Sequence, residues 1–547
     1  MLVAERLTVS APPRLSLRLG LPSEGQAVFG LSAGSYLALA LVLALRFHVV
    51  TAQALGLVAN AAYVALSRDP HLAAIGFVGS PLPSIAVLPL LPLRALWPAL
   101  TETGLAACIV SALFMAGAVY QLHQCLLEAR VPRAPRLGLT VLFALHPLVL
   151  YSAALGMQEA AYLFFLLLAV RHLARWLRTK DAMGEVVAGF ALAGAYLSRY
   201  DAALAGVAVV LAVAVISGVR SREHRLATAA CDAAIVGGPL LGAVALWAAA
   251  AWLVTGNAFP QVSSTYGYLP QLDALRAHGA PLATPARTLL QVLSIEPALP
   301  AVVLLLAWTI LRRNPGALAA VVFGPLAIAI GVAGLLGWAF PWLRLFIVLV
   351  PLTTLALALP LAESGAGRAA RPDRPRWPFA LAACLMLAAA LPTTVSAMLN
   401  PATGQEEAPV LTAIRTQGVS SSRTLASATD AARYLDDRHL GQGTVLLDSF
   451  TGFPIMLASS SPRQFLITSD REFAVALRSP VAFGVRYILV PAPGYLNGLG
   501  SLDAVNHAYP DLYPAGAASG ELVREFTGPG KHVEWRLYRV AAVQPSA

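Results

Sequence analysis

Long apolar runs set the strongest limit on what this chain can fold into. About 20 consecutive apolar residues are needed to cross a bilayer as a helix. The chain has 547 residues, of which 58% are hydrophobic and only 12% are charged, whereas soluble domains carry about 25% charged residues. We therefore expect a polytopic α-helical membrane protein. Its eleven expected spans are 28–46, 103–125, 137–154, 159–177, 185–198, 200–218, 229–254, 288–310, 317–337, 342–361 and 378–397.

Short arginine clusters lie in alternate gaps between these runs. By the positive-inside rule such clusters mark cytoplasmic loops. The pattern predicts a multi-pass protein of a bacterial plasma membrane with a cytoplasmic N-terminus. The formal net charge of +10 then reflects topology, and no nucleic-acid partner is expected. The clusters are Arg14 and Arg18; Arg130, Arg133 and Arg136; Arg171, Arg175, Arg178 and Lys180; Arg220, Arg222 and Arg225; Arg312 and Arg313; and Arg368, Arg371, Arg374 and Arg376.

Two further apolar segments, 48–67 and 83–98, flank the stretch 67–84. If only one of them crossed the membrane, every later arginine cluster would change sides. Either both cross or neither does, and the second is interrupted by several prolines. We expect neither to cross, and both to lie along the outer membrane surface on either side of Asp69.

The character of the chain changes after residue 397. We expect a transmembrane domain over 1–397, a linker over 398–420, and an α/β domain over 421–547 outside the cytoplasm. Short apolar runs predict strands, and polar-capped amphipathic runs predict helices. The expected strands are 444–448, 464–468, 486–491 and 535–540, and the expected helices begin at 427 or cover 470–477 and 502–509.

Few ionisable residues lie on the expected outer side, and they come from loops far apart in sequence. A transfer reaction onto a hydroxyl needs a carboxylate to take up the acceptor proton. It also needs cationic groups to hold an anionic leaving group. Asp69 suits the first role and Arg344 the second. The full set is Asp69, His71, Glu159, Arg199, Asp201, Arg276, His278 and Arg344.

Five local patterns resemble one family of membrane enzymes. They are the acid and proline-rich segment at 69–84, the acid-opened span at 151–164, the Arg-x-acid turn at 197–204, the ThrGlyAsnAlaPhePro loop at 255–260, and the Arg-aromatic segment at 342–351. Their order is similar to that in the GT-C superfamily of integral membrane glycosyltransferases, in particular the protein O-mannosyltransferases and lipid A aminoarabinose transferases. The likeness covers about residues 28–397.

The resemblance implies an inverting sugar transfer from a polyprenyl-phosphate donor to a glycan, lipid or protein acceptor outside the cytoplasm. By position, Asp69 would be the catalytic base, Glu159 a second catalytic acid and Arg344 a phosphate contact. Loops of this family often carry paired acids, whereas Arg68 and Pro70 flank Asp69 here. A role for a divalent metal is left open. The remaining substrate-binding candidates are His71, Arg199, Asp201, Tyr266 and His278.

Each candidate also has a purely structural explanation. Asp69 would suit a helix N-cap, and Glu159 would be stabilised by the helix dipole. Arg199 and Asp201 could clamp two spans together, and Arg344 could extend toward the membrane surface. Two other functions fit the same pattern: a transporter or flippase for a lipid-linked sugar, and a non-catalytic protein of cell-envelope assembly.

Overall fold

The computed structural model describes residues 23–221, 223–279, 282–311, 317–362, 377–416, 425–496, 498–516, 520–528 and 532–540. Several predicted features lie outside these ranges. They are the end of the linker and the arginine clusters at Arg14 and Arg18, at Arg312 and Arg313, and at Arg368, Arg371, Arg374 and Arg376, together with Arg222.

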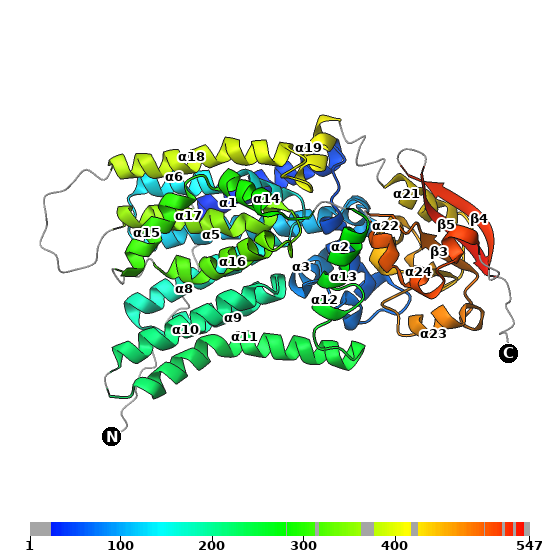
Figure 1. Cartoon of the computed structure of the whole chain (residues 1–547), viewed down its shortest axis with the longest axis horizontal. Coiled ribbons are helices and arrows are strands. Elements are labelled where there is room, and N and C mark those ends of the chain that lie inside the picture. The colour runs from blue at the N-terminus through cyan, green and yellow to red at the C-terminus, as the bar shows by residue number, and fades with distance from the viewer. Residues whose placement is uncertain are drawn as a thin grey trace, which may run out of the picture.

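A bundle of long helices is capped at one end by a small sheet domain (Figure 1). Eight helices are long and apolar enough to cross a membrane, or ten if each of two bent pairs is one span. This confirms the predicted multi-pass architecture. The eight are α1 with η1 (Glu24–Leu41, Val42–Arg46), α5 (Leu105–Glu128), α8 (Glu159–Thr179), α10 (Ala202–Arg220), α11 (Arg225–Thr255), α16 (Leu318–Leu335), η5 with α17 and η6 (Leu343–Val348, Leu349–Ala358, Leu359–Leu361), and α18 (Trp377–Leu399).

The other three expected spans have interrupted or shorter helices. The pair α6 (Arg133–Ala144) and α7 (Pro147–Ala154) bends by 58°, and the pair α14 (Pro285–Ile295) and α15 (Leu299–Leu311) bends by 78°. In each bent pair a proline lies at the start of the second helix or just before it. Proline cannot donate the helical hydrogen bond, which explains both breaks. Helix α9 (Ala182–Ser198) is a shorter apolar helix of 17 residues.

The two apolar segments around Asp69 form short elements between the bundle and the sheet domain. Helix α2 (Ala52–Leu66) has 15 residues, and α3 (Pro81–Val87) continues into η3 (Leu88–Ala95). A fifteen-residue helix rises only about 22 Å, which is less than the thickness of the hydrocarbon core. The remaining elements of this part are η2 (Leu72–Ile75), α4 (Ala99–Glu102), α12 (Pro260–Ser263) and α13 (Tyr268–Ala277).

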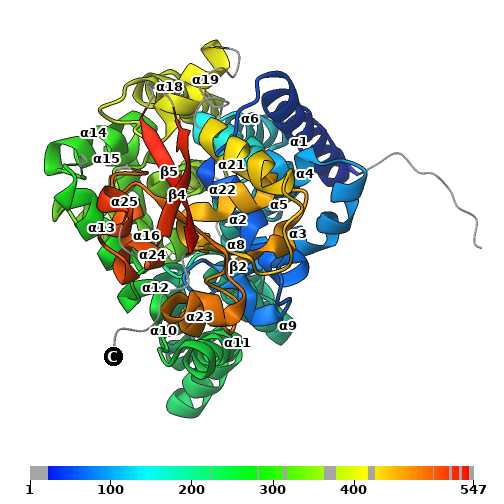
Figure 2. The ribbon, with the colours of Figure 1, turned by 90° about the vertical axis from the view of Figure 1, so that its right-hand side faces the viewer.

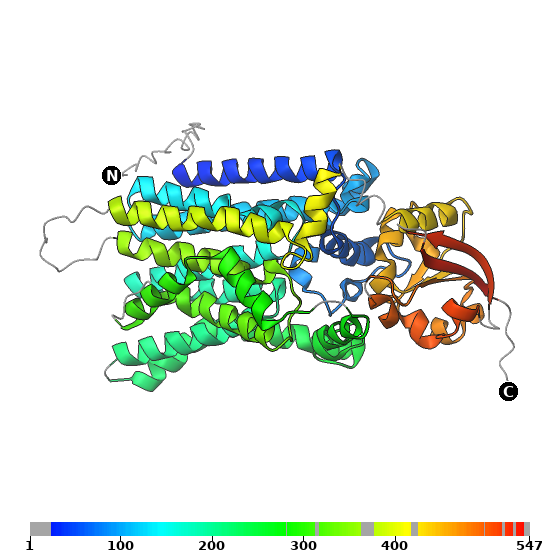
Figure 3. The ribbon, with the colours of Figure 1, turned by 45° about the horizontal axis from the view of Figure 1, so that its top comes forward.

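Ion pairs hold helix ends together at the bundle end that lies away from the sheet domain. Glu24, at the start of α1, bonds to Arg133 and Arg136 at the start of α6. Glu128, at the end of α5, bonds to Arg171 and Arg178 of α8. Figure 3 shows α1 running along the bundle from this end toward the sheet domain. These arginine-bearing loops therefore gather at one end.

The C-terminal domain is a mixed five-stranded sheet with the strand order β2-β1-β3-β5-β4. Strands β2, β1 and β3 are parallel, whereas β5 runs antiparallel to β3 and β4. The expected strands are confirmed as β1 (Val445–Leu447), β2 (Phe465–Ile467), β3 (Tyr487–Pro491) and β5 (Val533–Val540). Strand β4 (Gly520–Thr527) and helix α22 (Ser449–Ala458) were not anticipated.

Helices of this domain lie on either side of the sheet, and the domain covers the end of the bundle (Figure 2). The three parallel strands are buried along their length, with only Tyr487 partly exposed, as in a sheet covered on both faces. The expected helices are present as α21 (Ala426–Asp436), α23 (Phe473–Arg478) and α24 (Ala504–Ala508). The short remaining elements are α19 (Glu407–Arg415), η7 (Pro462–Gln464), η8 (Pro480–Phe483), η9 (Leu499–Leu502) and α25 (Leu512–Ala515).

A glycine allows α2 to approach the start of α8. Gly156 has φ +71°, and a Cβ built there would lie 2.6 Å from the Ala54 Cβ and 3.2 Å from the Ala107 Cβ. The contact fixes the N-terminal end of α2, the helix whose C-terminal end leads into the loop with Asp69.

We expect Gly156→Ala to lower the melting temperature of the purified protein more than Gly256→Ala does. Gly256 has φ +72°, but a Cβ there meets nothing within 4 Å. Both variants incur about 1–2 kcal/mol of backbone strain, and Gly156→Ala adds about 1–3 kcal/mol of overpacking. Tryptophan fluorescence during heating in detergent measures the melting temperature of both variants. An equal fall in the two would show that the contact with Ala54 is not tight.

Candidate functional site

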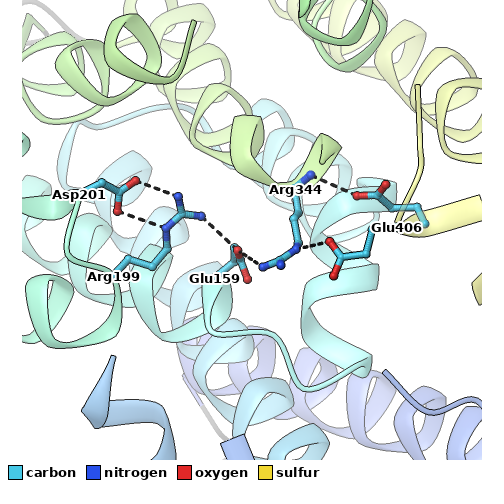
Figure 4. A network of polar contacts seen from close by, with 6 residues as sticks. Glu159, Arg199, Asp201, Arg344 and Glu406 are labelled. Atoms are coloured by element: carbon cyan, nitrogen blue, oxygen red, sulfur yellow. Dashed lines mark hydrogen bonds and ion pairs between the residues drawn. The ribbon is translucent and has the colours of Figure 1, made fainter. Parts of the chain in front are cut away.

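Charged side chains from four separate segments meet in one network of polar contacts (Figure 4), at the bundle end that faces the sheet domain. Glu159 opens α8, Arg199 and Asp201 lie in the turn between α9 and α10, and Arg344 lies in η5. Glu406 and Glu407 begin α19, just after the last span. We call these six residues the charged network: Glu159, Arg199, Asp201, Arg344, Glu406 and Glu407.

Glu159 is the centre of the network. Its Oε1 accepts hydrogen bonds from Arg344 Nη1 at 2.8 Å and from Arg199 Nη1 at 3.1 Å. The side chain is fully buried, and Oε2 has no hydrogen-bond partner among the described residues. The helix N-terminus adds a favourable dipole to the two guanidinium groups. Glu159 is therefore held as a carboxylate between two arginines that come from different helices.

Arg199 bridges Glu159 and Asp201. Its Nε and Nη2 donate to the two carboxylate oxygens of Asp201, at 3.2 Å and 2.8 Å. This fork geometry is the strong form of an arginine–carboxylate pair. The guanidinium also lies 4.9 Å from the ring centroid of Tyr162. The expected clamp between the two spans is therefore present, and it extends to Glu159.

Arg344 joins the bundle to the segment that leads to the sheet domain. Its Nε donates to Glu406 Oε2 at 2.5 Å, and its backbone N–H donates to Glu407 Oε1 at 3.2 Å. The guanidinium lies 4.5 Å from the ring centroid of Trp342. Both guanidinium groups of the network already face carboxylates. An anionic ligand would therefore have to replace one of these carboxylates in order to reach Arg344.

Asp69 lies in a second group, in contact with the sheet domain. Arg471 donates to it from Nη2, 3.2 Å from Oδ1, and from its backbone N–H, 3.3 Å from Oδ2. His71 Nδ1 lies 2.7 Å from the Asp69 carbonyl oxygen, and Arg68 pairs with Glu472. The Asp69 side chain is 27% exposed. In the described part of the chain no hydrogen bond or ion pair joins it to the charged network.

The loop 67–80, which we call the Asp69 loop, nevertheless contacts the network segment at its other end. The Tyr200 hydroxyl, between Arg199 and Asp201, donates to the Gly79 carbonyl at 2.7 Å. Trp247 Nε1 donates to the same hydroxyl at 2.9 Å. The loop thus runs from the sheet domain to the turn that holds the network.

The other aromatic and histidine candidates lie in a third group, where the segment 255–287 meets the sheet domain. The Tyr266 hydroxyl donates to Asp448 Oδ2 at 2.8 Å, and its ring lies 4.8 Å from that of Phe450. His278 lies against Gly498, where a Cβ would come within 2.4 Å of its ring. Both candidates therefore make interdomain contacts.

A cleft of about 720 Å³ lies between η3, α4 and the sheet domain. We call it the junction cleft. Its polar lining is Arg94, Glu102, Gln442, Ser459, Ser460, Ser461, Arg463 and Gln464. Leu66, at the end of α2, also lines the cleft, and Arg68 lies against Gly443 beside it. The cleft is thus adjacent to the start of the Asp69 loop.

Sequence reasoning missed Glu406, Glu407 and Arg471. The two glutamates lie in the segment that was expected to be a linker, and α19 forms there instead. Two adjacent acids directly after an apolar span were a usable signal. Arg471 gave none, because its importance comes from a contact across domains. In the part of the chain that the structure describes, no three His, Cys, Asp or Glu side chains form a group that could hold a metal ion.

We expect Glu159→Gln to destabilise the protein by about 3–5 kcal/mol, because it removes one partner from a buried charge cluster. Glu128→Gln is the matched control, since Glu128 also pairs with two arginines but is 24% exposed. Its loss should cost about 1 kcal/mol or less. Thermal melting in detergent compares the two variants. An equal fall in melting temperature would mean that burial of the ion pairs adds nothing to the stability that they provide.

We expect the stability of the protein to depend on pH through the Glu407 carboxyl group. Burial, and secondly the neighbouring Glu406 carboxylate, raise the pKa of Glu407 above its ordinary value of 4.5. The folded state then keeps a proton that the unfolded chain has lost, so this group makes stability fall as the pH rises above 4.5 toward the raised pKa. Glu407→Gln should flatten the profile of melting temperature against pH, and an unchanged slope would contradict this assignment.

Comparison with known proteins gives a match in structure alone. No family model matches the chain, and no curated protein matches it. The structure is similar to that of ArnT from Cupriavidus metallidurans bound to undecaprenyl phosphate, with a TM-score of 0.52, 13% sequence identity, and coverage of 95% of this chain and 99% of that chain.

Two further solved structures have lower scores. ArnT in the apo state gives a TM-score of 0.47 at 12% identity, over 96% of this chain and 100% of that chain. The Archaeoglobus fulgidus oligosaccharyltransferase tethered with an acceptor peptide gives 0.46 at 12% identity, over 95% of this chain and 74% of that chain. The match with a TM-score of 0.52 shows that the chain has the fold of ArnT, as the sequence resemblance implies.

Proposed function

We propose that this chain is a membrane glycosyltransferase that moves a sugar, with inversion, from a polyprenyl-phosphate donor to an acceptor outside the cytoplasm. The ArnT structure that it resembles over nearly its whole length holds undecaprenyl phosphate. The arginine-bearing loops that precede α6 and follow α8 lie at the opposite end of the bundle from the sheet domain (Figure 1). By the positive-inside rule this orientation leaves the sheet domain and the charged network outside.

The observation that carries the proposal is the contrast between two carboxylates at that outer end. Glu159 is buried and bonded to two arginines, whereas Asp69 is 27% exposed and its ion-pair partner Arg471 is 70% exposed. An exposed carboxylate with a weak surface partner can accept a proton, whereas one bonded to two buried arginines cannot readily do so. Asp69 is therefore the general base, and Glu159 orients the arginines.

In the proposed reaction an acceptor hydroxyl attacks the anomeric carbon of the donor sugar. Asp69 takes the hydroxyl proton, the bond from the anomeric carbon to the phosphate oxygen breaks, and polyprenyl phosphate leaves with the electron pair. Developing negative charge on the phosphate requires preorganised cationic groups. Arg344 supplies this charge, and Arg199 supports it through the shared Glu159 carboxylate.

The donor phosphate would reach Arg344 by exchange with Glu406. The Arg344 side chain is 4% exposed, but that of Glu406 is 23% exposed, so Glu406 is the more accessible of the two. A phosphate offers the same charge and the same acceptor geometry as the carboxylate that it replaces. The junction cleft, with hydroxyl, amide, Arg94 and Glu102 groups, suits a polar acceptor such as a glycan.

We expect Asp69→Asn to lower the rate of sugar transfer by about 10²–10⁴-fold, the usual contribution of a general base. The assay uses purified protein in detergent with labelled polyprenyl-phosphate sugar and candidate acceptors. Detergent micelles have no second compartment, so a transporter or an assembly protein would give no product in this assay.

The matched control is Arg471→Ala, which breaks the same ion pair but leaves the carboxylate in place. We expect this variant to keep transfer within a few-fold of wild type. Full activity of Asp69→Asn would remove Asp69 as the base. Equal losses in both variants would mean that the interdomain contact is what matters, and absence of transfer by the wild type with any donor would contradict the enzyme itself.

A further inference from the structure

Both bent pairs of helices break at an ionisable residue. The break between α6 and α7 is at His146, and the break between α14 and α15 is at Glu296. Neither residue is used in the transfer chemistry proposed above. Ionisable groups inside a membrane bundle are costly, and they usually mark a functional site. Broken helices are also where membrane proteins place ion-binding groups.

The two breaks lie against each other across α18. His146 Nε2 lies 3.4 Å from the Thr394 hydroxyl oxygen, and that hydroxyl donates to the Ser294 carbonyl at 3.2 Å. His146 Nδ1 accepts the Leu148 N–H at 3.3 Å, so the ring hydrogen is on Nε2. His146 is therefore a neutral ring that reaches from one break toward the other.

Glu296 has no such partners. Its side chain is 0% exposed, and neither carboxylate oxygen has a hydrogen-bond partner among the described residues. The Thr353 hydroxyl of α17, the group that faces it, is also fully buried and without a partner there. Among the described residues no ion pair involves Glu296. An ionised carboxylate in this environment would be uncompensated, which membrane interiors do not tolerate.

We infer that Glu296 carries a proton and that the break between α14 and α15 is an intramembrane proton-binding site, with the Thr353 hydroxyl as its polar neighbour. A protonated acid both donates and accepts one hydrogen bond. The Thr353 hydroxyl can complement it in either direction. The site takes no part in the transfer chemistry, and the inference does not depend on the proposed function.

The test uses the full chain in detergent and N,N′-dicyclohexylcarbodiimide, an apolar reagent that modifies protonated carboxylic acids. We expect a covalent adduct on Glu296 at neutral pH by peptide mass spectrometry. Glu24 is the internal control, because its bonds to Arg133 and Arg136 keep it ionised and unreactive. The adduct should be absent in Glu296→Gln, a variant that mimics the neutral acid and should keep wild-type thermal stability.

Infrared spectroscopy tests whether Glu296 is protonated even if the carbodiimide cannot reach it. The carbonyl stretch of a protonated carboxylic acid should be present in wild type and absent from Glu296→Gln, so it should appear in the difference spectrum of the two. Absence of this band overturns the inference. Protection from the reagent by sodium chloride, but not by choline chloride at the same pH, would also overturn it, because the occupant would then be a metal cation.

Discussion

The bonds between one oxygen of Glu159 and two arginines hold together the end of the bundle that faces the sheet domain. Through that atom α8 is joined to the turn between α9 and α10 and to η5. Arg344 then extends the connection to α19, which leads into the sheet domain. Taking such charges out of water is expensive, and only near-complete pairing offsets the cost. The charged network therefore requires every one of its helix ends to be in place at once.

That requirement explains why the sheet domain and the bundle form a single working unit. The segment after the last span could have been an unstructured connection. Instead Glu406 and Glu407 bond to Arg344, while Tyr266 and Arg471 bond across to the other side of the junction. An acceptor bound in the junction cleft would contact both parts, since Arg94 comes from η3 and Ser459 to Gln464 come from the sheet domain.

Most of the fold could be predicted from the sequence, because hydrophobic length and arginine placement directly determine where spans begin and end. Four strands of the sheet were also recognisable as short apolar runs. Strand β4 was not, because its residues are largely exposed and polar at the sheet edge. For the site, the sequence identified Glu159, Arg199, Asp201 and Arg344 as candidates, and these four side chains do meet. It could not reveal that Asp69 bonds to Arg471, since that pair joins positions 402 residues apart.

The Asp69 loop is tied at both ends, to Arg471 of the sheet domain and through Gly79 to Tyr200 of the bundle. A rigid-body swing of the sheet domain would pull on this tether and carry the carboxylate with it. In the proposed reaction, opening of the junction to a substrate and placement of the proton acceptor would thus be coupled through this loop.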